Sequence, residues 1–292
     1  GMKPTYGAIS RHGLMAMASS LDQIGPMTKS VDDAEILFEA IRGEDPKDST
    51  TLPPKHFRSE MLPAKLRIGV PYDFLKEGVD VEVLSNFNQT LANLKSLGHE
   101  IVPVDLPYIK YSLAVYYILM PAEASTNLAR YDGVRFGLHV DGANSIEDYF
   151  KTRAAGFGPE VRRRIILGSY VLSAGYYDAY YKKACAVRDL ISRDFDRVFS
   201  GDGQIAPVHA VLTPTSPTPA FKIGEKSDPL SMYLADIFTV PSNIAGVPSI
   251  SVPTGFALRD GKKLPLGTLI TTSRGREDIM FGVGKVISLP RI

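Results

Sequence analysis

The fold is decided by residues 66–107, "LRIGVPYDFLKEGVDVEVLSNFNQTLANLKSLGHEIVPVDLP". The apolar run "LRIGVP" (66–71) is short and ends in proline, which is typical of a buried strand. An apolar stripe at helical spacing follows and stops at a glycine; its members are Val83, Leu84, Phe87, Leu91 and Leu94, with Gly98 after them. "HEIVPVDLP" (99–107) predicts a second strand. A strand, a helix and a strand joined by short connections predict a parallel crossover unit and therefore an α/β fold.

Helices and strands are predicted on both sides of this unit. Residues 30–33, "SVDD", resemble a capping box and predict a helix that ends before Gly43. Residues 44–64 are polar and rich in proline, so we expect a surface connection. The middle of the chain reads as helical, and Pro121 is expected to kink or divide one helix. The predicted helices cover 108–131, two ranges within 159–199, and 276–288. A strand is predicted at the start of 209–221, before a proline-rich loop, and two more are predicted at 248–255 and 264–272.

The composition indicates a globular protein that can bury a substantial core. The 292 residues are 44% hydrophobic and 22% charged, and the net charge is only +1, so no electrostatic footprint for nucleic acid stands out. The single cysteine, Cys185, excludes an internal disulfide and suits a reducing compartment. No apolar run approaches the roughly 18 residues of a membrane span, and the first residues lack signal-peptide features. We therefore expect a soluble protein of the cytoplasm or an organelle matrix.

Several familiar catalytic patterns are missing from the sequence. The five histidines are widely separated, and no spacing of histidine or cysteine predicts a metal site. "FGVGKV" (281–286) lacks the third glycine and the preceding strand of a dinucleotide fingerprint. No G-x-S-x-G elbow is present, and Cys185 reads as an inert structural cysteine.

Three features remain as candidates for function. Arg162, Arg163 and Arg164 lie at a predicted helix start, where cations oppose the macrodipole, so they are either a solvated face or a site for something anionic. Asp236 is a lone acid in an apolar stretch, and it is either a helix-surface residue or a partly buried, partnered group. A set of tyrosines is expected mostly to pack in the core or between helices, with one member free to face a polar site; the set is Tyr116, Tyr117, Tyr176, Tyr177, Tyr180 and Tyr181.

An arginine and an aspartate that converge in one pocket would have a simple ligand. The guanidinium binds an α-carboxylate through two hydrogen bonds, and the carboxylate accepts from an α-ammonium group. Together they would recognise a free amino acid, although the sequence does not show whether they converge.

The opening residues carry a resemblance to a known family. "GMKPTYGAISRHGLMAMASSLDQIGPMTKS" (1–30) resembles the segment that follows the catalytic serine in amidase-signature enzymes. The resemblance continues through 123–137, 160–184, 212–221 and 228–253, and covers about nine-tenths of the chain. It is strongest to the branch of glutamine-dependent amidotransferases that act on glutamyl-tRNA(Gln). The fold that it implies is an amidase-signature α/β fold, with a mixed central sheet and helices on both faces.

The resemblance implies both an activity and a set of substrate-binding residues. Family members hydrolyse amides with a Ser–cis-Ser–Lys triad, and the glutamine-dependent branch passes ammonia to a partner protein. By position, Arg164 matches the contact to the glutamine carboxylate, Asp236 the acid that takes the ammonium group, and Tyr116 a tyrosine lining the same pocket. The implied partners are B and C subunits, with tRNA bound through B. No cofactor is expected in this chain, since the partner protein uses ATP and Mg²⁺.

The triad itself is expected upstream of Gly1, and Ser19, Ser20 and Lys3 do not replace it. We therefore expect residues 1–292 to be the C-terminal portion of a single amidase-signature domain, inactive alone and prone to self-association or marginal stability. Two segments depart from the family, "SGDGQIAPVHA" (200–210) and "LPLGTLITTSRGRED" (264–278). Two alternatives to the amidotransferase stay open: an amidase of the same family acting on another small amide, and a non-catalytic binding module in which residues 1–292 are the mature product.

Overall fold

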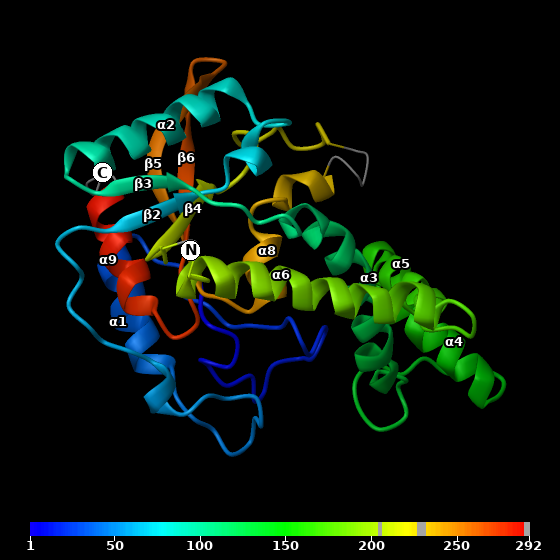
Figure 1. Cartoon of the computed structure of the whole chain (residues 1–292). Helices are drawn as coiled ribbons and strands as arrows, with labels where there is room; N and C mark the ends of the chain where they lie inside the picture. Colours follow the sequence, from blue (N-terminus) through cyan, green and yellow to red (C-terminus); the bar gives the residue numbers. More distant parts are fainter. Residues whose placement is uncertain (204–205, 227–231, 289–292) are drawn as a thin grey trace. The chain divides into compact units, whose positions relative to one another are not determined.

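The computed structural model describes residues 1–203, 206–226 and 232–288. Contacts divide the chain into two compact units, each described here by itself (Figure 1). The first unit comprises Gly1–His12, Gln23–Leu113 and Arg188–Ile292, and the second comprises Gly13–Asp22 and Ala114–Val187. The single domain over 1–292 stays a prediction. Parts of two expected segments, at 204–205 and 228–231, lie outside the described residues.

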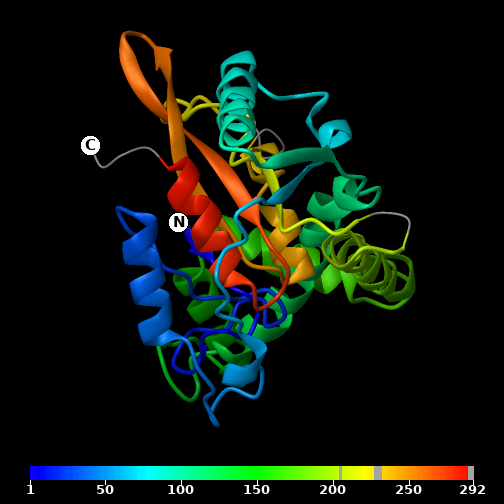
Figure 2. The same cartoon turned by 60° about the vertical axis from the view of Figure 1, so that its left-hand side comes forward.

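The described part of the first unit is built on a six-stranded mixed sheet, and a mixed sheet is what the family resemblance implies. Its strands are β1 (Met2–Lys3), β2 (Arg67–Val70), β3 (Glu100–Pro103), β4 (Ala210–Pro214), β5 (Ser249–Arg259) and β6 (Lys262–Thr271), in the order β1-β5-β6-β4-β2-β3. β2 pairs in parallel with β3 and β4, whereas β6 pairs antiparallel with β4 and β5. The crossover inferred from residues 66–107 is therefore confirmed. Figure 2 shows β5 and β6 as one long hairpin, in orange.

Three helices share a hydrophobic core with one face of this sheet. They are α1 (Val31–Ile41), α2 (Val81–Ser96) and α9 (Glu277–Ile287), and each supplies buried side chains. Ile68, Leu212 and Ile270 point into this core and are completely buried. Because side chains alternate along a strand, Val211 and Leu269 point to the opposite face, and they are also buried. Both faces of the sheet therefore carry buried side chains. The divergent segment 264–278 begins within strand β6, where Leu269 is buried.

Local sequence signals account for the helix ends. Ser30 caps α1 by accepting from the Asp33 N–H at 3.1 Å, and Asp80 caps α2 by accepting from the Glu82 N–H at 2.9 Å. Gly98, with a φ of +92°, follows the end of α2. The caps formed by Ser30 and Asp80 satisfy N–H groups that a helix leaves unpaired at its start.

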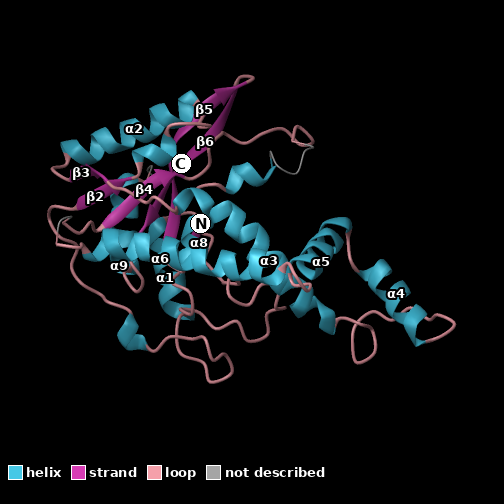
Figure 3. Ribbon diagram, turned by 45° about the vertical axis from the view of Figure 1, so that its right-hand side comes forward, coloured by secondary structure: helices cyan, strands magenta, loops and turns pink. Residues whose placement is uncertain are grey.

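The described second unit is helical, as Figure 3 shows. It contains most of α3 (Ser112–Asn127), then α4 (Ser145–Gly156), α5 (Pro159–Val171), a π-helical turn (Tyr177–Lys182) and the start of α6 (Lys183–Ser200). α3 continues as one helix through Pro121, so of the two expected outcomes, a kink or a division, the division is wrong. The helix continues without the N–H of Pro121, at a level where α5 packs closely against α3, as described below. No helix in the described ranges is long and apolar enough to cross a bilayer.

Candidate functional site

Arg164 lies in the second turn of α5 and is held by an acid from the first turn. Its Nε donates to Oε1 of Glu160 at 2.9 Å, and Arg163 pairs with the same carboxylate. Glu160 thus supplies a negative charge for two of the three arginines at this helix start, Arg163 and Arg164. The two arginines differ in burial, since 23% of the Arg164 side chain is exposed against 55% of Arg163. Arg164 is therefore the one that faces the interior of the second unit.

The structure brings Arg164 together with Tyr116. Burial lowers the pKa of Arg164, but the Glu160 hydrogen bond and the neighbouring Tyr116 and Tyr117 outweigh it and raise the pKa above its usual value. The guanidinium stays charged. Nη1 of Arg164 lies 3.6 Å from the Met120 Sδ, and the rings of Tyr116 and Tyr117 meet edge to face with centroids 5.0 Å apart. Two of the three predicted site residues thus form one polar cluster between α3 and α5.

A glycine allows α3 and α5 to approach closely enough for this cluster. A Cβ at Gly168 would lie 1.9 Å from the Pro121 carbonyl oxygen and 2.9 Å from the Ser125 Cβ. No side chain fits at those distances, so only glycine permits the observed packing. The contact is one turn beyond Arg164 on α5, and it fixes the separation between the guanidinium and α3.

Asp236 lies in the first unit, at the end of a short 3₁₀ turn (Leu234–Asp236). The residue is exposed, which agrees with the surface alternative for this acid. Its backbone carbonyl accepts from the N–H and the Oγ1 of Thr239, both at 3.1 Å. Among the apolar residues near Asp236, Phe238 is buried. Its ring packs against Phe74, with the ring centroids 5.4 Å apart. The pairing of Asp236 with Arg164 stays a prediction.

The remaining tyrosines differ from the expectation of buried packing. Tyr176, Tyr177 and Tyr180 are each about 40% exposed. They stack on neighbours instead, with ring centroids 6.0 Å apart for Tyr176 and Tyr180, and 5.3 Å apart for Tyr177 and Tyr181. The π-helical turn that carries them places aromatic rings side by side on its own surface.

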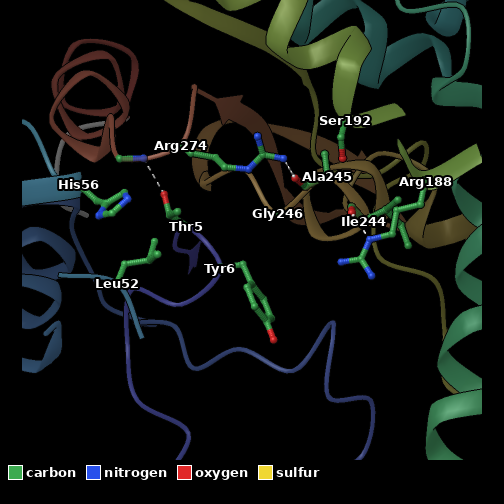
Figure 4. Close-up of a pocket in the computed structure, with 11 residues that line it drawn as sticks. Thr5, Tyr6, Leu52, His56, Arg188, Ser192, Ile244, Ala245, Gly246 and Arg274 are labelled. Carbon is green, nitrogen blue, oxygen red and sulfur yellow. Dashed lines mark hydrogen bonds between the residues drawn. The ribbon is translucent and has the colours of Figure 1, made fainter. Parts of the chain in front are cut away.

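A cleft of about 410 Å³ opens in the first unit (Figure 4). Arg188 and Arg274 line it and reach the end of α8 (Val240–Ala245) from two sides. Nε of Arg188 donates to the Ile244 carbonyl at 3.0 Å, and Nη2 of Arg274 donates to the Ala245 carbonyl at 2.5 Å. Cations stabilise the C-terminal end of a helix, where carbonyls lack partners. The two arginines therefore stabilise α8, the helix that follows Asp236 in the chain.

A pair of perturbed groups lies close to the cleft wall. Burial lowers the pKa of the Lys3 amine to about 7, against a smaller opposing effect of Glu277. Burial also raises the pKa of Glu277, whose Oε1 accepts from the Thr5 N–H at 2.9 Å. A lowered lysine pKa is a mark of catalytic sites, but Nζ of Lys3 donates to the Pro4 carbonyl at 2.7 Å and to Gln23 Oε1 at 3.2 Å. Two acceptors within the fold thus hold the Lys3 amine in place, and the exclusion of Lys3 from the triad stays a prediction.

The burial of Lys3 predicts that stability depends on pH. A lysine with a lowered pKa binds fewer protons folded than unfolded between about pH 7 and about pH 10.5, so stability rises across that range, by at most about 1.4 kcal/mol per pH unit. Lys3→Met removes this dependence. We expect the wild type to gain stability relative to Lys3→Met as pH rises from about 7 to about 9, and urea unfolding at each pH measures the two stabilities. A difference that stays constant with pH would show that Lys3 remains charged in the folded protein.

Sequence reasoning missed Arg188, Arg274 and the burial of Lys3. None of them stands in a spacing that signals a site, and their contacts join residues far apart in the chain, such as Arg274 with Ala245. Across the described ranges, no group of three histidine, cysteine, aspartate or glutamate side chains is arranged to hold a metal ion.

A family model and several curated relatives match nearly the whole chain. The family model described as Amidase matches residues 1–280. The chain is 53% identical over 288 residues to the A subunit of the glutamyl-tRNA(Gln) amidotransferase of Microcystis aeruginosa, covering 97% of this chain and 58% of the relative. It is 50% identical over 297 residues to the corresponding protein of Pseudothermotoga lettingae, which has the same name, covering 100% and 60%.

Solved structures agree with these relatives. The crystal structure of the A subunit of glutamyl-tRNA(Gln) amidotransferase from Thermotoga maritima superposes with a TM-score of 0.76 at 43% identity, covering 98% of this chain and 57% of that one. A crystal structure of an amidase gives a TM-score of 0.72 at 26% identity, covering 98% and 56%. The chain spans somewhat under two-thirds of the length of these relatives. Because the family model covers most of the sequence and the relatives align over nearly all of it, the chain belongs to the amidase-signature family.

Proposed function

We propose that this chain is part of the A subunit of a glutamyl-tRNA(Gln) amidotransferase, and that it binds the amino-acid end of glutamine. The observation that carries the proposal is the 53% identity to such a protein over almost the whole chain. In the proposed reaction, glutamine is hydrolysed and the ammonia passes to a partner that converts Glu-tRNA(Gln) to Gln-tRNA(Gln). The protein would work in the cytoplasm, or in an organelle matrix, beside B and C subunits.

Each proposed substrate contact has a physical basis. Arg164 is charged, fixed by Glu160 and mostly buried, so it is prepared to bind the α-carboxylate of glutamine. Tyr116 interacts electrostatically with Arg164 and is proposed to line the same site. Asp236 is an exposed acid suited to accept hydrogen bonds from the α-ammonium group. These residues bind and orient the substrate, and they perform no bond-breaking step.

The nucleophile and its base are proposed to come from outside residues 1–292. In this family the attacking group is a serine that a second serine and a neutral lysine activate. The partner protein is proposed to use ATP and Mg²⁺ for the amidation step. Within this chain, the proposed role is to place the side-chain amide of glutamine before that serine.

The proposal predicts that the purified chain does not hydrolyse glutamine. With substrate contacts but no nucleophile, ammonia release should equal that of buffer, whereas the longer protein that includes the Ser–cis-Ser–Lys region should release ammonia at a rate typical of enzymes. Ammonia is measured after incubation with glutamine, and with a simple aliphatic amide in parallel. Turnover by residues 1–292 alone would contradict the assignment. Turnover of the simple amide but not of glutamine by the longer protein would favour an amidase of another small amide.

A further inference from the structure

The two connected helices α4 and α5 expose an unusual amount of apolar surface. Ile146 and Phe150 on α4 are 64% and 73% exposed, and Ile166 on α5 is 70% exposed. Helices in proteins gain most of their stability by burying an apolar face. α4 buries only Thr152 among its described residues, so its apolar side chains lie uncovered.

These side chains line a groove of about 550 Å³ between the two helices. Tyr149, Phe157 and Ile165 complete its apolar wall. The two helices are joined by only Phe157 and Gly158, and both lie at the right of Figure 3. A groove lined by two connected helices is a shape into which a third helix packs. α4 has 12 residues, which corresponds to a contact length of about 18 Å.

The charged residues of the groove are both cations. Arg153 already has partners within the second unit, since its Nη1 donates to the carbonyls of Leu128 and Tyr131, both at 3.0 Å. Arg162 is exposed, and among the described residues it forms no ion pair, unlike Arg163 and Arg164. It lies near the start of α5, where the macrodipole makes an unpaired cation unfavourable. A carboxylate at this position would remove that cost.

We propose that this groove is the docking site for an amphipathic helix of a different subunit of the amidotransferase, whose apolar face fills the groove and whose carboxylate pairs with Arg162. The inference rests on the proposed function, because relatives of this chain carry the name of one component of a larger enzyme. Charge favours a different protein over a second copy of this chain. Two copies of the groove face to face would bring like charges together, which opposes association.

The direct test places a photo-crosslinking residue in the groove of the complete enzyme. Phe150 is replaced by p-benzoylphenylalanine in the longer protein, produced together with the B and C subunits encoded in the same genome. After irradiation, the crosslinked peptide is identified by mass spectrometry. The expected product joins position 150 to a helical segment of B or C that carries apolar residues at helical spacing and an acid. A crosslink to a second copy, a crosslink to the preceding part of the same chain, or no crosslink in an assembled complex would overturn the inference.

Variants give an independent readout. Phe150→Glu should weaken assembly with the other subunits by about 30-fold, as expected for a buried interface anchor. Arg162→Glu should weaken assembly and remove part of its dependence on salt. Ile223→Glu and Lys55→Glu are matched controls, since both residues are exposed and lie outside the groove, and they should leave assembly unchanged. Equal effects of groove and control variants would count against the docking site.

The same preparation separates the two proposals. If it hydrolyses glutamine but yields no crosslink to B or C, the docking inference fails and the proposed function stands. If it yields the crosslink but hydrolyses no glutamine, the docking site stands and the proposed function fails.

Discussion

Replacing Arg164 by alanine in the complete enzyme is expected to lower kcat/KM for glutamine by about 100-fold, because truncating one partner of a buried charge pair costs about 2–5 kcal/mol. The loss should spare a simple aliphatic amide, which has no α-carboxylate to bind. Steady-state ammonia release with each substrate measures both effects. An equal loss with both substrates would indicate that Arg164 supports the fold and does not recognise glutamine.

Arg163→Ala is the matched control for this prediction. Arg163 is the preceding residue on α5 and pairs with the same Glu160, but more than half of its side chain is exposed. Exposed ion pairs contribute little, about 0–1 kcal/mol. The control should therefore change kcat/KM for glutamine by less than about fivefold. If both variants lose the same activity, the loss comes from breaking an ion pair with Glu160, and Arg164 has no special role in binding glutamine.

Replacing Gly168 by alanine is expected to destabilise the protein by about 2 kcal/mol, although alanine is the better helix former by about 1 kcal/mol. The added Cβ would overlap the Pro121 carbonyl oxygen, which belongs to backbone and cannot rotate away. α5 must move from α3, and Arg164 moves with it. Urea unfolding measures the stability, and an increase in KM for glutamine in the complete enzyme reports the displaced guanidinium.

Gly156→Ala controls for helix propensity. Gly156 is also helical, but a Cβ there would meet its nearest neighbour, the Leu138 side chain, at an ordinary 3.5 Å. This variant should be as stable as the wild type or slightly more stable. If Gly168→Ala behaves in the same way, close packing between α3 and α5 is not what positions Arg164.

The sequence predicts the sheet well because its signals are local. The stripe from Val83 to Leu94 defines α2, and the apolar runs on either side define β2 and β3 in the predicted parallel arrangement. Pro121 shows the limit of local signals: it stands inside α3 without ending the helix, and Gly168 of α5 packs closely against its carbonyl. Propensity describes the cost of a proline in a helix, but tertiary packing decides whether the helix breaks.

The candidate site is only partly predictable for the same reason. The position of Arg164 at a helix start raises the question of a compensating anion, and Glu160, four residues earlier, is the answer. No periodicity in the sequence reveals the burial of Lys3, because it depends on residues far apart in the chain. The same holds for the hydrogen bonds from Arg274 and Arg188 to the end of α8. The roles of Arg164, Tyr116 and Asp236 in binding glutamine stay predictions.

The central claim is that this chain recognises glutamine for an amidotransferase, and the source of nitrogen tests it most directly. The measurement is formation of Gln-tRNA(Gln) from Glu-tRNA(Gln) by the complete enzyme with ATP, supplied with either glutamine or ammonium chloride, for the wild type and Arg164→Ala. The account predicts that the variant loses the glutamine-dependent reaction and keeps the ammonium-dependent one, because only recognition of glutamine is removed. A variant that loses both reactions, or keeps both, would contradict it.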